Sequence, residues 1–135
     1  MKKKILIIQG SSLKKINIKT DTSFFLGLEA QKRKFQIYYY EPKELSFVNG
    51  KVKALCSQIK FEDNPKKPVK VLSKTVLNLL KAKLILIRNE PPFNQQYINT
   101  TFILEHISKK VRIINHPKSL REVPEKLFSL KLIKY

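Results

Sequence analysis

The sequence predicts an α/β protein of three layers, in which helices cover both faces of a mainly parallel sheet that includes one hairpin. Short apolar runs, too short for helices, alternate along the chain with segments whose apolar residues have helical spacing. The pair Asn49-Gly50 separates two strand-like runs and is typical of a tight hairpin turn. A chain of 135 residues is long enough for one domain with its own core.

The first strand and helix are expected near the amino terminus. Lys4–Gln9 is apolar almost throughout, as in a strand buried on both faces. A turn at 10–12 and a basic loop at 13–20 follow. Either Asp21 or Thr22 can cap the next helix, because both side-chain oxygens can accept a backbone N–H of its first turn.

The face of that helix can be read from its apolar residues. Phe24, Leu28 and Gln31 share one stripe, and we expect Phe25 to widen the face that meets the core. The aromatic run Phe35–Tyr40 then favours a second strand.

The middle of the chain is expected to hold a hairpin, a loop and a short helix. The hairpin strands are Leu45–Val48 and Lys51–Phe61, on either side of the Asn-Gly turn. Residues 62–70 contain two prolines and several lysines, which indicates an exposed loop. We expect a short helix over 73–80.

The last third begins with an apolar strand over 84–88 that breaks off at a charged residue and two prolines. Residues 95–109 have helical spacing, and 111–115 is a further strand. The apolar residues of the expected helix are Ile98, Phe102, Ile103 and Ile107. Ser119 is a candidate cap of a helical turn, and Pro124 suits the first position of a helix over 125–133.

The net charge of +18 raises the question of a nucleic-acid partner. Nearly all of the positive charge is lysine, and it is scattered from one end of the chain to the other. Proteins that read nucleic acids tend to gather charge on one face and to use arginine for paired contacts. The pattern therefore indicates a solvated lysine-rich surface with weak, sequence-indifferent binding to polyanions.

The remaining chemistry of the chain is sparse. Cys56 lies in a strand-like run and is expected to be a small inert hydrophobe, which suits the reducing cytoplasm. His106 and His116 lack the spacing of metal ligands, so no metal site is expected. The apolar run 5–8 is too short for a secretion signal or a membrane span. We expect a soluble cytoplasmic protein without a membrane partner.

Several segments resemble a known family. Residues 88–94, Arg-Asn-Glu-Pro-Pro-Phe-Asn, resemble the Arg-Lys-Asp-Pro-Pro-Phe-Asp signature of the amino-terminal domain of bacterial glutathione synthetase. Further similar segments follow the family's order at 16–24, 28–31, 49–50, 97–105 and 115–128. The chain thus resembles this domain over nearly its whole length.

The resemblance implies a Rossmann-like pre-ATP-grasp fold for residues 1–135, with the chain ending near the junction to an ATP-grasp domain that it lacks. Glutathione synthetases join γ-glutamylcysteine to glycine, using ATP and Mg²⁺ as cofactors. This sequence has neither a glycine-rich phosphate loop nor a late acidic cluster suited to magnesium. We therefore expect no catalytic residues here, and no cofactor bound by this chain alone.

The resemblance also implies site residues. Arg88 follows an apolar strand, where α/β sheets place ligands, and its planar fork suits a peptide carboxylate. An ion pair with Glu90 is the structural alternative for Arg88. Asn17, Asp21 and Ser23 fall in the family's substrate loop, although Asp21 is explained equally well as a helix cap.

Two further residues are implied to contact ATP. Lys126 matches a family lysine near the domain junction, where a compact positive charge suits phosphate. Arg121 lies in the family's Ser-Leu-Arg and can bind phosphate, or it can pair with Glu125 four residues later.

The chain also departs from the family pattern. The family's first strand ends in Met-Asp-Pro, whereas here Gln9-Gly10 replaces the acid and the proline. In the 88–94 signature a lysine is lost and the last acid becomes an amide. These changes place substrate contact by the first-strand loop in doubt.

Three interpretations remain at this stage. The first is the amino-terminal substrate-pocket domain of a glutathione synthase, inactive alone and working beside a separately encoded ATP-grasp chain, or a gene fragment. The second is a non-catalytic module that docks on such a partner, with a homo-oligomer as another assembly. The third is a basic protein associated with nucleic acids.

Overall fold

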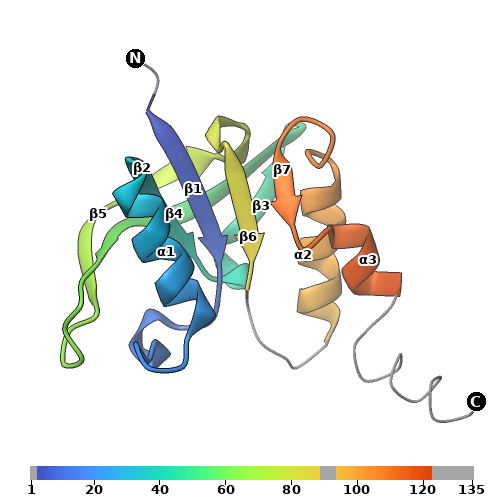
Figure 1. The fold of residues 1–135 in the computed structure, drawn as a ribbon. Helices are drawn as coiled ribbons and strands as arrows, with labels where there is room; N and C mark the ends of the chain where they lie inside the picture. Colours follow the sequence, from blue (N-terminus) through green and yellow to red (C-terminus); the bar gives the residue numbers. More distant parts are fainter. Residues whose placement is uncertain (1–2, 89–93, 123–135) are drawn as a thin grey trace, which may run out of the picture.

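The computed structural model describes residues 3–88 and 94–122 (Figure 1). Within these residues, seven strands form one sheet with three α-helices packed around it. The strands are β1 (Lys4–Gln9), β2 (Phe35–Tyr40), β3 (Leu45–Val48), β4 (Lys51–Phe61), β5 (Val69–Asn78), β6 (Leu84–Ile87) and β7 (Arg112–Ile114). The helices are α1 (Thr22–Lys32), α2 (Gln95–Glu105) and α3 (Pro117–Glu122). The expected α/β class is confirmed.

One half of the sheet is parallel. The strand order is β3-β4-β2-β1-β6-β7, and β1 pairs in parallel with β2 and β6, while β6 pairs in parallel with β7. Because their carboxyl ends meet at one edge, the loops that follow β1 and β6 lie beside each other. The strands expected at 4–9, 35–40, 84–88 and 111–115 are all present.

The other half of the sheet is antiparallel. β4 pairs with β2, β3 and β5. The predicted hairpin of β3 and β4 is confirmed, and Asn49 and Gly50 both have the positive φ angles, 52° and 73°, that its two-residue turn requires.

The expected short helix over 73–80 is wrong, because these residues belong mostly to β5. The expected loop at 62–70 is correspondingly shorter, since β5 begins at Val69. The sequence predicted a single hairpin, β3–β4, but the structure has a second one, β4–β5. β5 contains three valines and one threonine, which favour the extended backbone, and β4 offers a long edge for them to pair with.

The core lies on both faces of the sheet because side chains alternate along the parallel strands. Leu6 and Ile8 of β1 pack with Phe24 of α1, whose ring meets Phe61 of β4 edge-on at 5.5 Å between centroids. Ile7 faces the opposite way, into a cluster that includes Leu104 of α2. Figure 1 shows α1 in front of the sheet.

The helix faces differ from the sequence expectation. Phe25 and Phe102 are 53% and 51% exposed, so neither widens the core. On α2, Thr100 and Thr101 turn inward instead, and their hydroxyls donate to backbone carbonyls three residues back. Backbone bonding inside the helix satisfies these hydroxyls, which is why small polar residues are tolerated against the sheet.

The ends of the last helices also differ from the prediction. α2 ends at Glu105, four residues earlier than expected. Ser119 lies inside α3 and does not cap it. The expected helix at 125–133, with Pro124 at its start, lies outside the described residues. In the described ranges, no helix combines the length and the apolar character that crossing a membrane requires.

Candidate functional site

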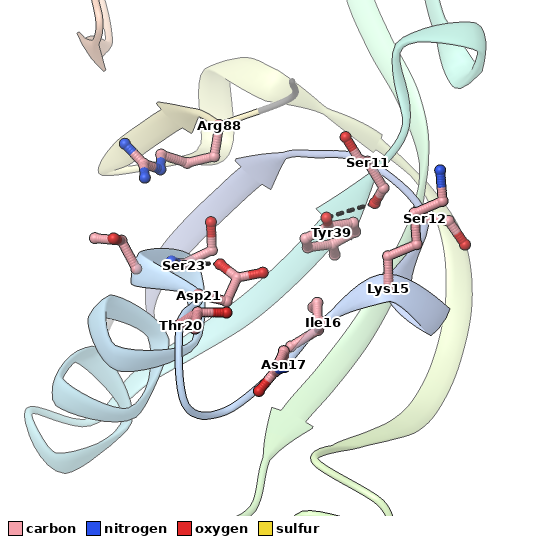
Figure 2. A pocket seen from close by; sticks show the side chains of 11 residues that line it. Ser11, Ser12, Lys15, Ile16, Asn17, Thr20, Asp21, Ser23, Tyr39 and Arg88 are labelled. Carbon is pink, nitrogen blue, oxygen red and sulfur yellow. Dashed lines mark hydrogen bonds between the residues drawn. The ribbon is translucent and has the colours of Figure 1, made fainter. Parts of the chain in front are cut away.

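A pocket of about 240 Å³ lies at the carboxyl ends of β1 and β6 (Figure 2). It is formed by the loop after β1, the first turn of α1 and the residue that follows β6. The lining residues are Ser11, Ser12, Lys15, Ile16, Asn17, Thr20, Asp21, Thr22, Ser23, Tyr39 and Arg88. This edge of a parallel sheet is where α/β proteins commonly bind ligands.

The loop after β1 is held down by Tyr39. The phenol of Tyr39 is buried, and its O–H donates to the carbonyl of Ser11 at 2.6 Å. A side chain at Gly10 would collide with the Tyr39 ring, so the close approach requires glycine. The backbone N–H of Gly10 donates to the Tyr40 carbonyl at 3.0 Å and extends the β1–β2 pairing into the loop.

The first turn of α1 forms another side of the pocket. Asp21 is the helix cap, because its Oδ1 accepts the Ser23 N–H at 2.8 Å. The Asn17 carbonyl accepts the N–H groups of Thr20 and Asp21 at 3.2 and 2.9 Å. The Asn17 side chain accepts the Lys19 N–H at 2.9 Å. These bonds fix the loop that carries Asn17, Asp21 and Ser23.

Arg88 provides the positive charge across the pocket from this turn. Its backbone N–H donates to the Gln9 carbonyl at 2.7 Å, so the residue is anchored at the end of the β1–β6 ladder. Its side chain is exposed, and Figure 2 shows the guanidinium extended above Ser23. In the part of the chain that the structure describes, no carboxylate forms an ion pair with Arg88. The alternative partner, Glu90, lies outside that part.

The pocket combines two cations with one carboxylate. Lys15 and Arg88 are positively charged, and Asp21 has a second carboxylate oxygen besides the one that caps α1. Hydroxyl and amide groups occupy most of the remaining wall. Such a site suits a small polar ligand that carries carboxylates and an ammonium group.

The four residues expected to bind substrate, Asn17, Asp21, Ser23 and Arg88, all line this one pocket. Their role in binding stays a prediction. The described structure does not place the residues implied for ATP relative to this pocket. Arg121 belongs to α3, but its side chain is not among the described features, and Lys126 lies outside the described residues.

Sequence reasoning missed Lys15 and Tyr39. Lys15 is one lysine among many, and its sequence signal is only its place shortly after the first strand. The sequence places Tyr39 only in the expected strand over 35–40, and its ring does pack in the sheet's core, buried beside β1. The sequence did contain one indication of its role: Tyr39 is near the end of β2, which pairs with the end of β1, so its hydroxyl can reach the loop after β1.

The surroundings of Gln9 explain why an amide can stand where the family has an acid. Its side chain is buried, and its Oε1 accepts the O–H of Tyr40 at 2.7 Å. Burial raises the pKa of the Tyr40 phenol, with a further contribution from Cys56, so Tyr40 remains a donor. A neutral amide suits this site better than a carboxylate because a buried charge is costly. Gln9 does not line the pocket.

The described residues form no cluster of metal-binding side chains. Across 3–88 and 94–122, no three His, Cys, Asp or Glu side chains lie close enough together to hold a metal. Asp21 is the pocket's single acid among its lining residues.

The fold and the pocket together define an α/β domain with a polar pocket at the carboxyl ends of its parallel strands, the place where such domains commonly bind small ligands. The sequence comparison is more specific, since residues 4–121 match the family described as the N-terminal domain of prokaryotic glutathione synthetase. The chain belongs to this family.

Individual relatives agree. The glutathione synthetase of Buchnera aphidicola subsp. Schizaphis graminum is 42% identical over 118 residues, which are 87% of this chain and 37% of the relative. That of Mesorhizobium japonicum is 38% identical over 128 residues, covering 95% and 41%. That of Escherichia coli O127:H6 is 39% identical over 115 residues, covering 84% and 36%. The chain thus spans 36–41% of the length of these relatives.

Proposed function

We propose that this domain forms one wall of the substrate pocket of a glutathione synthase, a cytoplasmic ATP-dependent ligase that joins γ-glutamylcysteine to glycine. The family membership supports the activity. The observation that carries the proposal is the convergence of Asn17, Asp21, Ser23 and Arg88 on one pocket that also contains Lys15.

In this proposal the domain binds and orients the dipeptide. Arg88 donates two parallel hydrogen bonds to a carboxylate of γ-glutamylcysteine, which its planar fork favours. Lys15 adds a second positive charge on the other side of the pocket, where it suits the ligand's second carboxylate (Figure 2). The free oxygen of Asp21 accepts from the ligand's ammonium group, and Asn17 and Ser23 hydrogen-bond its remaining polar atoms.

ATP supplies the phosphoryl group that activates a carboxylate in this class of ligase. The described residues form no cluster of metal-binding side chains and no phosphate loop, so we assign no phosphoryl-transfer step to them. Contact of Lys126 and Arg121 with ATP stays a prediction from family resemblance. We therefore expect the 135-residue chain alone to form no glutathione from γ-glutamylcysteine, glycine and ATP.

The test is a titration of the 135-residue chain with γ-glutamylcysteine, followed by NMR or calorimetry up to millimolar concentrations. Arg88→Ala should weaken binding roughly ten- to hundredfold, because a charge-assisted hydrogen bond contributes about 1.5–3 kcal/mol. Arg88→Lys should lie in between, since lysine keeps the charge and loses the fork.

Arg112→Ala is the matched control, because Arg112 is an exposed arginine on β7 that does not line the pocket. It should change the dissociation constant by less than about twofold. Equal binding by wild type and Arg88→Ala, with unchanged melting temperatures, would remove Arg88 from the site. Absence of dipeptide binding to the wild-type chain would favour the interpretation as a docking module.

A further inference from the structure

A second hollow, separate from the substrate pocket, lies between the loop after β1 and the tip of the β4–β5 hairpin. It measures about 470 Å³, and Ile16 lines both it and the first pocket. Its lining residues are Leu13, Lys14, Ile16, Pro65, Lys66, Lys67, Pro68, Val69 and Val71. The floor is therefore apolar and every charged lining residue is a lysine. We call this hollow the lysine groove.

One side of the lysine groove is the strand β5, which lies at an edge of the sheet. Within the described residues β5 pairs only with β4, so its other side presents unpaired backbone N–H and C=O groups. Val71, Leu72 and Val76 are about half exposed or more, at 49%, 50% and 63%. In Figure 1 the β4–β5 hairpin extends past α1 at the lower left, where its outer edge is accessible.

This combination is what an added strand requires. Peptides that join a sheet edge gain main-chain hydrogen bonds from the edge and specificity from pockets for alternate side chains. Here the edge is β5, and the lysine groove lies against its first residues, Val69 and Val71. A strand along β5 could place alternate apolar side chains over these valines.

The charges indicate the partner. Lys66 and Lys67 rim the lysine groove, and Lys70 and Lys74 are exposed on β5 itself. The nearby acids, Glu62 and Asp63, do not line the groove. A second copy of this chain would bring another +18 and more edge lysines, which oppose pairing of like strands. An acidic segment would be attracted instead.

We propose that the β5 edge and the lysine groove bind an extended segment of another protein in which acidic and apolar residues alternate. The segment adds to the sheet as a strand beside β5. Its apolar side chains cover Val69 and Val71, while the carboxylates beside β5 point to the other face, toward Lys70. Acidic residues that extend beyond β5 toward the hairpin tip pair with Lys66 and Lys67. This inference is independent of the proposed function because it uses neither Arg88 nor Asp21.

The probe is a fluorescein-labelled peptide of five Glu-Val repeats with blocked ends, titrated with the 135-residue chain and followed by anisotropy. The double variant Lys66→Glu/Lys67→Glu should weaken binding about tenfold or more. The control Lys109→Glu/Lys110→Glu changes the net charge equally at an exposed site after α2 and should weaken it less than about twofold.

A peptide of five Glu-Ser repeats tests the apolar floor, and it should bind about tenfold more weakly than the Glu-Val peptide. Hydrogen exchange should show new protection at amides of β5 when the Glu-Val peptide binds. Equal losses in the two double variants, or equal binding of the two peptides, would show diffuse attraction and overturn the proposal. A self-associated chain with protected β5 amides, or no peptide binding, would also overturn it.

Discussion

The parallel and antiparallel halves of the sheet expose their strands very differently. In the parallel half, Leu6, Ile7, Ile8 and Ile85 are at most 2% exposed, because helices cover both faces. In the antiparallel half, β5 is exposed over most of its length, and only Leu77 near its end is buried. The two halves are joined through β4, whose side chains alternate between core and solvent.

The two halves therefore offer different kinds of site: the parallel half has a pocket fixed by buried strands, and the antiparallel half has an exposed edge strand, β5. The pocket that contains Arg88 lies where β1 and β6 end, and its loop is tied to these strands and to β2 by backbone hydrogen bonds from Gly10 and Arg88. The lysine groove lies against the hairpin tip and the start of β5, a strand whose side chains are mostly exposed. We infer that the parallel half sets the stability of the domain, while the β5 region contributes surface for contacts.

The largest expected effect tests that inference with a matched pair of valine and isoleucine truncations. Ile85→Ala should lower the free energy of unfolding by about 2–5 kcal/mol, because Ile85 is fully buried between β1 and β7 and leaves a cavity. Val76→Ala should change it by less than about 0.5 kcal/mol, since Val76 is 63% exposed.

Urea unfolding followed by circular dichroism measures both variants. If Val76→Ala costs as much as Ile85→Ala, the β5 region is part of the cooperative core and the contrast between the halves fails.

The second prediction concerns Cys56, which shows that the antiparallel half still contributes to the core. Burial, with a smaller contribution from Glu44, raises the pKa of the Cys56 thiol from 9.0 to about 12. The unfolded chain loses this proton above pH 9, whereas the folded chain keeps it. Below pH 9 this thiol therefore does not lower the free energy of unfolding. As the pH rises from 9 toward 12, the free energy of unfolding falls by up to about 1.4 kcal/mol per pH unit.

In the Cys56→Ala variant, the free energy of unfolding should fall less between pH 8.5 and 10 than it does in wild type. This window begins at the ordinary pKa of a thiol, about 8.5–9, and lies mostly below the pH at which tyrosines titrate. Unfolding in urea at successive pH values measures it. The folded wild-type thiol should also resist Ellman's reagent at pH 8, as expected of an inert buried cysteine. Rapid labelling under native conditions would show that β4 opens readily.

The sequence predicted the parallel half well, because its strands are continuous apolar runs that only a buried strand explains. Lys4–Gln9 and the run at 84–88 are examples. It failed at β5, because Ser73–Leu80 carries no periodic pattern that distinguishes a strand exposed on both faces from a short helix. Only pairing with β4, a non-local contact, decides the outcome.

Helix faces were predicted less well for a related reason. Spacing favours Phe25 and Phe102 as core residues, but about half of each side chain is exposed. Gly27 lies so close to Phe61 that an added methyl group would clash with the ring. The sequence placed Asn17, Asp21, Ser23 and Arg88 near one sheet edge, whereas Lys15 and Tyr39 needed the folded loop to be found.

The smallest expected effect concerns Asp21, where a structural and a binding role meet in the parallel half. Asp21→Ala should lower the free energy of unfolding by about 0.5–2 kcal/mol, because the Ser23 N–H loses its cap. Asp21→Asn keeps an oxygen in the same place and should cost less than about 0.5 kcal/mol. Thr22→Ala is the control, since Thr22 is exposed and does not cap α1.

The same pair of variants separates the two roles of this carboxylate. If its second oxygen accepts from the ligand's ammonium group, Asp21→Asn should weaken γ-glutamylcysteine binding severalfold while the melting temperature stays close to that of wild type. If Asp21 only caps the helix, Asp21→Asn should bind as wild type does, and Asp21→Ala should lose affinity only as far as α1 loosens. A calorimetric titration of each variant at fixed pH decides between these outcomes, because removing the charge and removing the cap are then measured independently.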